Sequence, residues 1–375
     1  MRMNFYGDTI EIPVNPSFIA PLNSPLSDSS VLSFYTNIDH ATYQPVINAL
    51  LDYKNQHQLD DWLYYQLIRS AAELISPKSA NYQRYTLYKW FFLAKSGYAS
   101  TISINNDRLL LYVQSDDEVF NIPYHIKNGK QYVCLNYHDY HTIDFDKEKF
   151  TAVNIYIPGA AKAFSYKVNK LPDFKPADYT VKELQFDYYQ TQYHFKVMLN
   201  RQIKNIFKNY PVVDYETYFN IPLSKMTYSS LIPLLKENIK KMNQKNGVDY
   251  LMRFTRYAFA FETDTDNFGA EKRLSPEQTL LYDNSDCEDR AGLFFYLVKE
   301  LYNLPMIVLS YPQHITVAVE FDKPIGHPII YKGNNYWVCE PTPQSQDLSI
   351  GQTLPSLRKV PFDVVYAYSP KPLNP

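Results

Sequence analysis

The feature that most constrains the fold of this 375-residue chain is an internal similarity between two of its segments. RYTLYKWFFLAKSGYASTISINNDRLLLYV, from Arg84, and RAGLFFYLVKELYNLPMIVLSYPQHITVAV, from Arg290, have the same apolar pattern without a gap at a shift of 206 (290 − 84). A shift of 205 aligns YVCL (Tyr132–Leu135) with WVCE (Trp337–Glu340). The identity is low, so two unrelated helix–strand units are the alternative. Because the pieces keep the same order over about 100 residues, we predict a duplicated chain.

The second copy carries an insertion that the first copy lacks. LDDWLYY, from Leu59, resembles GVDYLMR, from Gly247, at a shift of only 188 (247 − 59), which leaves 18 extra residues (206 − 188) in the second copy. They lie within FETDTDNFGAEKRLSPEQTLLYDNSD, the segment that leads up to Cys287. This segment of the second copy is therefore built for a purpose that the first copy does not share.

Each copy reads as helices followed by strands. In the second copy, helical periodicity predicts helices over Ser229–Met242, Gly247–Phe261 and Cys287–Tyr302. The strand-like runs MIVLSY, HITVAVEF and YWVCE follow them. Strands that come after helices, rather than alternating with them, indicate the α+β class. We predict three domains: residues 1–145 as the first copy with an amino-terminal strand, 146–215 as a small all-β linker domain, and 216–375 as the second copy.

Composition excludes several kinds of partner. A net charge of −2 and a pI near 6.5 provide no field for nucleic acid or an anionic membrane. The 3 cysteines include no Cys-x-x-Cys pair and no cluster with histidine, so we expect neither a metal nor a cofactor. The amino terminus has no apolar signal core, and no 18-residue apolar stretch occurs. We therefore expect no membrane segment, and a cytoplasmic protein unless a leader was removed, in which case a periplasmic one.

Cys287 lies where LLYDNSDCEDRAGLFFYLV changes from a polar turn into an apolar helical run. If Ser285 or Asp286 caps this helix, the thiol lies in its first turn, where unpaired N–H groups and the helix dipole favour a thiolate. The adjacent carboxylates, including Glu288 and Asp289, oppose that effect. A cysteine in this position therefore needs a base to act as a strong nucleophile.

The carboxylates beside Cys287 have an ordinary explanation. We expect Glu288 and Asp289 to form ion pairs with Arg290 or other cations, while the acids as a group help to cap the helix. The alternative is a calcium site that also uses Asp264 and Asp266 from the preceding segment. That alternative is weak because too many oxygen ligands remain unidentified.

His314 is the best placed of the 8 histidines to act as the base. It opens the strand HITVAVEF, so its side chain can project from a sheet edge towards the end of a neighbouring helix. His327, in a Gly-His-Pro context, is more typical of a loop. Glu340 ends YWVCE, and a return strand would bring it alongside His314, where a carboxylate can orient the imidazole. Each residue alone is more often structural, and it is their combination with Cys287 that predicts a catalytic set.

The order of Cys287, His314 and Glu340, in the settings SDCEDRAGLFF, YPQHITVAV and YWVCEPT, resembles the transglutaminase-like superfamily of cysteine enzymes. More narrowly, NFGAEKRLSPEQTLLYDNSDCEDR is similar to bacterial transglutaminase-like proteins, and the close match covers about residues 267–354. The resemblance implies a papain-like core, in which the cysteine helix packs on an antiparallel sheet that bears the histidine and an acid. The family pattern has Asp-Pro-Thr where this sequence has Glu-Pro-Thr, and glutamate is one methylene longer.

The first copy departs from the family pattern completely. The alignment places Asn81 at the position of the cysteine, Arg108 at that of the histidine and Leu135 at that of the acid. We therefore expect the first copy to keep the fold without the chemistry.

These residues predict a cysteine-dependent amide hydrolase or acyltransferase with a peptide or protein substrate. Cys287 would form a thioester, His314 would protonate the departing amine, and water or a second amine would resolve the intermediate. The oxyanion would meet the Cys287 N–H and a donor from Gln278 or Asn267, both weak candidates, with Asp286 in a supporting role. The first alternative is a peptide-binding scaffold with two inactive copies. A metalloprotein that uses the cysteine and the histidine lacks further ligands.

Overall fold

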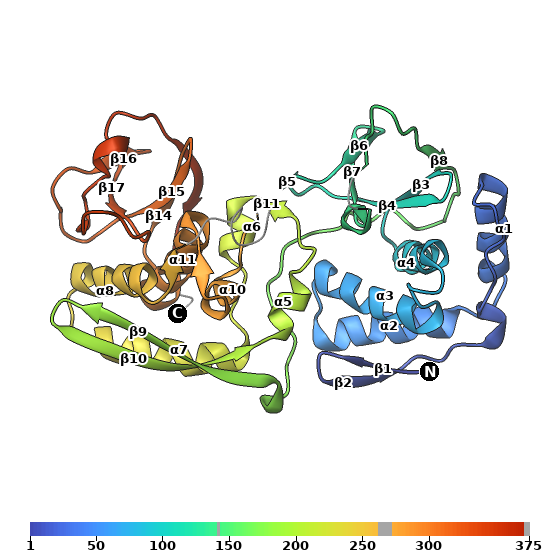
Figure 1. Ribbon diagram of the computed structural model, residues 1–375, viewed down its shortest axis with the longest axis horizontal. Helices are drawn as coiled ribbons and strands as arrows, with labels where there is room; N and C mark the ends of the chain where they lie inside the picture. Colours follow the sequence, from blue (N-terminus) through green and yellow to red (C-terminus); the bar gives the residue numbers. More distant parts are fainter. Residues whose placement is uncertain (141–142, 262–271, 371–375) are drawn as a thin grey trace. The chain divides into compact units, whose positions relative to one another are not determined.

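The structure is a computed structural model that describes residues 1–140, 143–261 and 272–370 (Figure 1). The chain divides into two compact units, each of which combines helices with an antiparallel sheet. Unit 1 comprises residues 1–172 and 208–214, and unit 2 comprises residues 173–207 and 215–375. Helices precede the main sheet in both units, so the predicted α+β class is confirmed.

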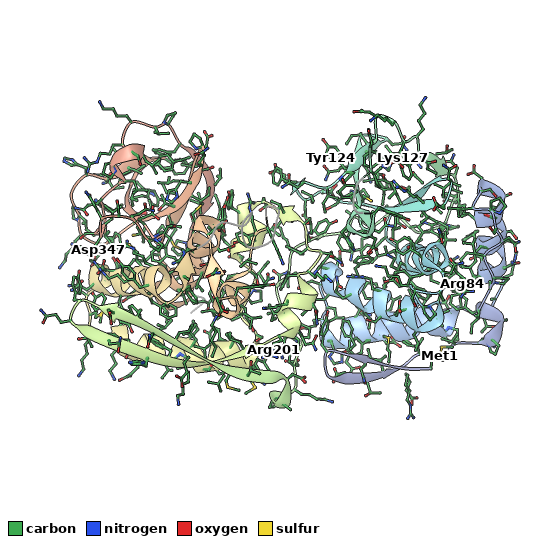
Figure 2. The ribbon with its side chains drawn as sticks, viewed as in Figure 1. Met1, Arg84, Tyr124, Lys127, Arg201 and Asp347 are labelled. Carbon is green, nitrogen blue, oxygen red and sulfur yellow. The ribbon has the colours of Figure 1, made fainter. Side chains whose placement is uncertain are left out.

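Unit 1 contains an amino-terminal hairpin, a group of helices and a five-stranded sheet. Its helices are η1 (Pro16–Phe18), α1 (Asp28–Asp39), α2 (Gln44–His57), α3 (Asp61–Ile75), α4 (Tyr82–Lys95) and η2 (Tyr137–Asp139). Its strands are β1 (Arg2–Phe5), β2 (Asp8–Glu11), β3 (Ser100–Asn105), β4 (Arg108–Gln114), β5 (Val119–Phe120), β6 (Tyr124–Lys127), β7 (Lys130–Cys134), β8 (Thr151–Val153) and β11 (Val212–Val213). The sheet has the order β6-β7-β4-β3-β8, and α4 packs against β3 and β4. Figure 2 shows Tyr124 and Lys127 at the edge strand β6.

Unit 2 repeats this plan with a longer hairpin. Its helices are η3 (Pro176–Asp178), α5 (Gln202–Ile206), α6 (Tyr215–Phe219), α7 (Lys225–Ile239), α8 (Gln244–Tyr257), α10 (Pro276–Leu281), α11 (Cys287–Tyr302) and η4 (Pro355–Leu357). Its strands are β9 (Tyr179–Tyr188), β10 (Thr191–Asn200), β12 (Ala260–Phe261), β13 (Asn284–Ser285), β14 (Met306–Tyr311), β15 (His314–Val319), β16 (Ile329–Tyr331), β17 (Asn334–Cys339) and β18 (Asp363–Tyr368). The sheet has the order β16-β17-β15-β14-β18, and α11 packs against β15 (Figure 1).

The two five-stranded sheets have the same topology. If the strands of each sheet are numbered as the chain reaches them, both have the spatial order 3-4-2-1-5. The helix that precedes each sheet is α4 in unit 1 and α11 in unit 2. The first strands, Ser100–Asn105 and Met306–Tyr311, are related by the shift of 206 that aligns the two sequences.

The separate linker domain predicted for residues 146–215 is absent from the described structure. Residues 146–172 and 208–214 belong to unit 1, where β8 pairs with β3 and β11 pairs with β5. Residues 173–207 belong to unit 2, where the β9–β10 hairpin packs against α7 and α8. An isolated two-stranded hairpin is marginal in water, and its apolar face is buried here on the helices of unit 2.

The predicted helix boundaries are correct for one helix of the three. The Cys287–Tyr302 helix has the bounds that its periodicity predicts. The helix predicted for Gly247–Phe261 starts at Gln244, with Asn243 as its cap, and ends at Tyr257, after which Ala260–Phe261 pairs with β13. The helix predicted to start at Ser229 starts one turn earlier.

Both faces of the unit 2 sheet are covered. On one face, Ile307, Leu309, Ala318 and Val338 are buried, with Leu357 of the carboxy-terminal segment packed against them. Because side chains alternate along a strand, the intervening residues project to the opposite face. This second face packs against α11 and brings the start of that helix to the sheet.

The two sheets differ by one residue in the register of their second and fourth strands. Tyr112 pairs with Cys134 in unit 1, whereas Ala318, 206 residues later, pairs with Val338 in unit 2. Cys134 therefore occupies the place of Val338 and not that of Cys339. A slip of one residue reverses the face of a side chain, so the two strand cysteines project to opposite faces of their sheets.

The one-residue difference in register corrects one predicted match between residues of the two units. At the shift of 204 that the pairing imposes (338 − 134), the residue that corresponds to Glu340 is Asn136 and not Leu135. The sequence alignment instead superposed the identical Val-Cys dipeptides of the two strands.

Candidate functional site

Helix α11 begins with a reciprocal cap. Asp286 is the N-cap residue, and its carboxylate accepts a hydrogen bond of 3.0 Å from the N–H of Asp289. In return, the carboxylate of Asp289 accepts from the N–H of Asp286 at 3.4 Å. This capping box satisfies two of the N–H groups that a helix start leaves unpaired, and it places Cys287 at the first helical position.

Asp289 and Arg290 are structural residues of this helix start. Asp289 is fully buried and also accepts from the N–H of Leu274 at 2.8 Å and from the hydroxyl of Tyr218 at 3.2 Å. The guanidinium of Arg290 is fully buried and donates to five backbone carbonyls: Thr255, Arg256, Phe259, Ala260 and Ser285. Burial lowers the pKa of Arg290 to about 10, although Asp289 and Asp286 attract the positive charge.

His314 and Glu340 meet between adjacent strands. His314 is the first residue of β15, Glu340 follows the last residue of β17, and the two strands are hydrogen-bonded neighbours. The Nε2 atom of His314 lies 2.7 Å from Oε2 of Glu340, and the side chains are 13% and 3% exposed. The other oxygen of Glu340 accepts from the N–H of Thr342 at 2.9 Å. The carboxylate is therefore held by the backbone on one side and by the imidazole on the other.

The thiol of Cys287 lies beside the start of β15. The backbone of Ile315, the residue after His314, lies close enough to lower the pKa of this thiol. Its sulfur is 3.9 Å from Oε2 of Glu288, and no hydrogen bond joins it to His314 within the described residues. The structure therefore brings the cysteine near the His314–Glu340 pair, with no hydrogen bond between thiol and imidazole among the described residues.

The thiol is the favoured form of Cys287 in this environment. Burial is the main cause that raises the pKa of Cys287, and the negative charges of Glu288, Asp286 and Glu340 raise it further. The backbone of Ile315 acts in the opposite direction and lowers the pKa. The predicted stabilisation of a thiolate by the helix start is thus outweighed, and nucleophilic chemistry here needs a base that accepts the proton during attack.

The predicted oxyanion donors have different outcomes. Gln278 lies on α10, where its side-chain oxygen Oε1 accepts from the N–H of Ser275 at 3.1 Å in a second capping box. Its Nε2 is buried and has no hydrogen-bond partner among the residues that the structure describes. Asn267, together with Asp264 and Asp266 of the calcium alternative, lies outside the described residues. In the described ranges, no group of three or more His, Cys, Asp or Glu side chains is arranged to hold a metal ion.

Arg256 is a residue of the site that the sequence analysis missed. It is 2% exposed, and its Nε and Nη2 atoms donate to the backbone carbonyl of Glu340 at 3.1 and 2.5 Å. It also binds Asp347 at 2.7 Å, a residue labelled in Figure 2. An arginine on the apolar face of a predicted helix, one turn after Arg253, is the sequence signal that could have revealed it.

The corresponding positions of unit 1 have structural roles. Asn81 caps α4 by accepting from the N–H of Arg84 at 2.8 Å. Arg108 binds both oxygens of Glu148 at 2.9 and 2.7 Å. Asn136 accepts from a backbone N–H of β4 and donates to a backbone carbonyl of the same strand. None of the three is a nucleophile or a base.

The two other cysteines lie in strand-like apolar runs and are buried, as their sequence context predicts. Burial raises the pKa of Cys134 to about 12 and also raises the pKa of Cys339. Cys287 is the only one of the 3 cysteines that is partly accessible.

No protein-family model matches this chain, and a search of curated proteins also returns no match. Among the described helices, none combines the length and apolar character needed to cross a membrane.

Proposed function

We propose that this protein is a cysteine-dependent amide hydrolase or acyltransferase of the transglutaminase-like kind, with a peptide or protein substrate. The observation that carries this proposal is the 2.7 Å contact between Nε2 of His314 and Oε2 of Glu340, beside the helix that begins with Cys287. A buried carboxylate that engages one ring nitrogen fixes the imidazole and stabilises its protonated form. The proposed core is papain-like.

The proposed reaction begins with transfer of the thiol proton. Because Glu340 engages Nε2 of His314, Nδ1 is the nitrogen that accepts the proton of Cys287 as sulfur attacks the carbonyl carbon. The C–N bond of the amide then breaks, the imidazolium returns its proton to the leaving amine, and a thioester remains on Cys287. Water or a second amine attacks the thioester and releases the thiol. The raised pKa of Cys287 requires the proton transfer to accompany the attack.

Two donors support the oxyanion in this proposal. The N–H of Cys287 belongs to the first turn of α11, where backbone N–H groups lack helical acceptors. The Nε2 group of Gln278 is a buried donor without a partner in the described structure, so it can donate to a substrate oxygen without breaking another bond. Hydrolysis is the preferred outcome over transfer, because no site for an acceptor lysine is recognisable in the sequence.

A catalytically inactive, peptide-binding scaffold is the second candidate function. It is favoured by the negative charges that raise the pKa of Cys287 and by Glu340 in place of the family's aspartate. Reactivity of Cys287 towards an amide distinguishes the two candidates.

We further infer that unit 1 is a degenerate copy of the catalytic fold in unit 2. The shared spatial order of the strands and the shift of 206 between the first strands support this. Two arginines at the same shift also hold the segment before their helix: Arg84 binds Ser76, which ends α3, and Arg290 binds carbonyls at the end of α8.

The test is turnover of a peptide-amide library with an added primary amine, read by mass spectrometry. The proposal expects cleaved or amine-exchanged products with the native protein and none with Cys287→Ala. Cys134→Ala is the matched control, and it should retain activity because that cysteine is buried in a strand. Turnover that survives in Cys287→Ala would refute the assignment of the nucleophile.

A further inference from the structure

Unit 1 contains a buried lysine without a polar partner. Lys89, on α4, is 1% exposed and has no hydrogen bond or ion pair in the described residues. Its ammonium nitrogen lies 4.6 Å from the ring centre of Tyr85, 5.9 Å from that of Tyr82 and 6.0 Å from that of Tyr65. Aromatic faces attract a cation, but they do not replace the hydrogen bonds that an ammonium loses on burial.

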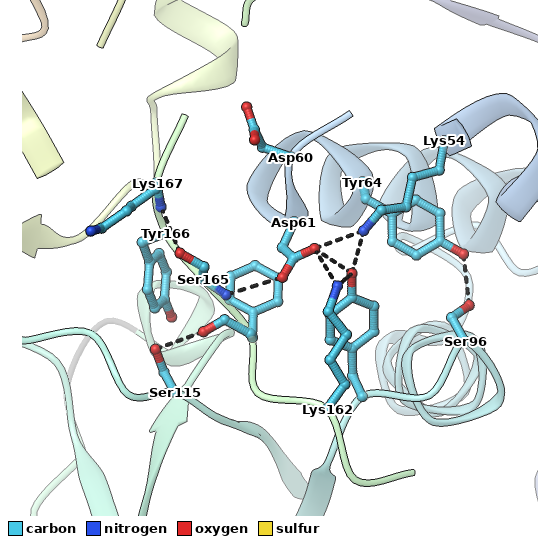
Figure 3. Close-up of polar contacts among 12 residues, drawn as sticks. Lys54, Asp60, Asp61, Tyr64, Ser96, Ser115, Lys162, Ser165, Tyr166 and Lys167 are labelled. Carbon is cyan, nitrogen blue, oxygen red and sulfur yellow. Dashed lines mark hydrogen bonds and ion pairs between the residues drawn. The ribbon is translucent and has the colours of Figure 1, made fainter. Parts of the chain in front are cut away.

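A second lysine of the same unit shows how such burial is normally compensated. The ammonium of Lys54, whose side chain is 15% exposed, lies 2.7 Å from the carboxylate of Asp61. The ammonium of Lys162 contacts the same carboxylate oxygen at 3.0 Å (Figure 3). The hydroxyl of Tyr98 also donates to this oxygen, at 2.5 Å. Lys89 has no carboxylate in such a position, so its environment differs in kind from that of Lys54.

Asp139 is the carboxylate whose charge acts on Lys89, and it is already hydrogen-bonded to other groups. Asp139 accepts from the ammonium of Lys78 at 2.5 Å and from the hydroxyl of Tyr82 at 2.8 Å, and His138 lies 3.5 Å away. Burial lowers the pKa of His138 to about 4, so this imidazole is neutral at neutral pH. Asp139 therefore offers Lys89 attraction from a distance and no hydrogen bond.

Other groups around Lys89 also lack an acceptor. The hydroxyl of Tyr65 and the Nε2 of Gln66 are buried without a hydrogen-bond partner among the described residues. Arg69, whose guanidinium donates to the side-chain oxygen Oε1 of Gln66 at 2.9 Å, acts electrostatically on both Tyr65 and Lys89. Neighbouring turns of α3 and α4 thus carry two buried donors without an acceptor, the hydroxyl of Tyr65 and the Nε2 of Gln66, beside the positive charges of Arg69 and Lys89.

We propose that Lys89, Arg69 and Tyr65 form a binding site for a small oxyanion, a carboxylate or phosphate group, in unit 1. An oxyanion accepts several hydrogen bonds and supplies the direct negative partner that Asp139, held by Lys78 and Tyr82, does not provide. The site is independent of Cys287 and of the proposed amide chemistry. It gives the copy without catalytic residues a binding function of its own.

The protonation of Lys89 provides a readout for this site. Burial, followed by the positive charge of Arg69, lowers the pKa of Lys89 to about 7; Lys78 acts in the same direction and Asp139 opposes it. Five other titratable groups face the cluster. They are Tyr65 on α3, Tyr82 and Tyr85 on α4, Cys134 on β7 and His138 on η2. An anion next to the amine favours the charged form, so binding should raise the pKa of Lys89 by about one unit.

The experiment is an NMR titration of the full-length protein labelled with 13C at the lysine ε-carbon, with and without inorganic phosphate or acetate at constant ionic strength. Chloride at the same ionic strength is the reference. We expect the pKa of Lys89 to rise with phosphate, with acetate or with both, and the pattern shows whether the site accepts phosphate, carboxylate or either group. Lys89→Met should remove the resonance and abolish anion-dependent thermal stabilisation, whereas Lys162→Met, at an exposed lysine with a carboxylate partner, should keep that stabilisation.

Tyr65→Phe removes one donor without loss of volume and should weaken phosphate binding about 3-fold to 10-fold, the usual effect of a single hydrogen bond. This variant keeps the test decisive if Lys89→Met does not fold. A pKa of Lys89 that neither phosphate nor acetate changes would overturn the proposal, as would anion-dependent stabilisation that persists in Lys89→Met. Neither result depends on whether Cys287 has catalytic activity.

Discussion

The helix starts of α4 in unit 1 and α11 in unit 2 lie on the same topology and carry different chemistry. In unit 2, the first helical residue is Cys287, and the adjacent strands supply the His314–Glu340 pair. In unit 1, the cap Asn81 stands at the aligned position, and the strand residues Arg108 and Asn136 bind a carboxylate and the backbone. The same topology therefore carries three structural side chains in unit 1 where unit 2 has the cysteine, the histidine and the glutamate. The proposed chemistry depends on these side chains and not on the fold.

The difference also shows where polar groups are satisfied. Asn136 of unit 1 completes its hydrogen bonds within its own sheet and with Tyr82. Glu340 of unit 2 is satisfied on one oxygen by the backbone and presents the other to an ionisable imidazole. A buried carboxylate in contact with a titratable partner is a typical arrangement of a functional site, whereas a fully satisfied amide is typical of a structural one.

The largest expected effect comes from replacing the carboxylate of Glu340 by an amide, the group that Asn136 carries at the corresponding position of unit 1. Glu340→Gln keeps the size and removes the charge that stabilises the imidazolium, so turnover should fall by about 100-fold to 10,000-fold with little change in stability. Glu340→Asp keeps the charge on a side chain one methylene shorter and should retain activity if the backbone allows the shorter reach. The measurements are kcat/KM on a cleaved library peptide and the urea midpoint of each variant. Equal turnover in the native protein and Glu340→Gln would place Glu340 among the structural residues, as in unit 1.

Much of this comparison could be predicted from the sequence. The bounds of α11 follow from its apolar periodicity, and the meeting of His314 with Glu340 follows from placing their two strand-like runs side by side in one antiparallel sheet. Both are local patterns that the sheet merely brings together. The cap at Asp286 was also recognisable, because aspartate before an apolar helical run is a common N-cap.

The features that escaped prediction depend on long-range packing. The one-residue slip that replaces Leu135 by Asn136 is hidden because both strands contain Val-Cys, and only their pairing partners distinguish the registers. The β9–β10 hairpin was assigned to a linker because its contacts with α7 and α8 join residues that are far apart in the sequence. The isolation of Lys89 was hidden as well, since a lysine in a helical run is usually exposed and the sequence does not reveal a missing partner.

A smaller effect is expected from the two aligned arginines. Arg290→Gln leaves several buried carbonyls of unit 2 without a donor and should lower the free energy of unfolding by about 3–5 kcal/mol. Arg84→Gln removes a single side-chain bond to Ser76 and should cost about 1 kcal/mol. Hydrogen exchange of peptides from α11 and α4 assigns each loss to its own unit. Equal losses for the two substitutions would contradict the view that unit 2 relies more heavily on Arg290 than unit 1 relies on Arg84.

The smallest expected effect concerns the negative charge of Glu288, which lies beside Cys287. Oε2 of Glu288 lies 3.9 Å from the sulfur of Cys287, and after burial its charge is the largest cause that raises the pKa of this thiol. Glu288→Gln removes the charge, so the pKa of Cys287 should fall by about one unit, a modest value because the site is partly open to solvent. Because the pKa of Cys287 is higher in the folded protein than in the unfolded chain, the contribution of this thiol to the free energy of unfolding is fully present below about pH 8.5. Above about pH 8.5 the unfolded cysteine loses its proton first, and this contribution falls.

The measurement is the rate of iodoacetamide alkylation of Cys287 between pH 6 and pH 10, followed by peptide mapping. The curve of Glu288→Gln should lie at lower pH than that of the native protein, with labelling of Cys134 and Cys339 negligible in both because they are buried. Glu300→Gln is the matched control, since Glu300 lies on the same helix but interacts with Tyr228 instead of the thiol. Superimposable curves for the native protein and Glu288→Gln would show that burial alone holds the proton on Cys287, and that its acidic neighbours serve the helix start in the same structural way as Asn81 serves α4.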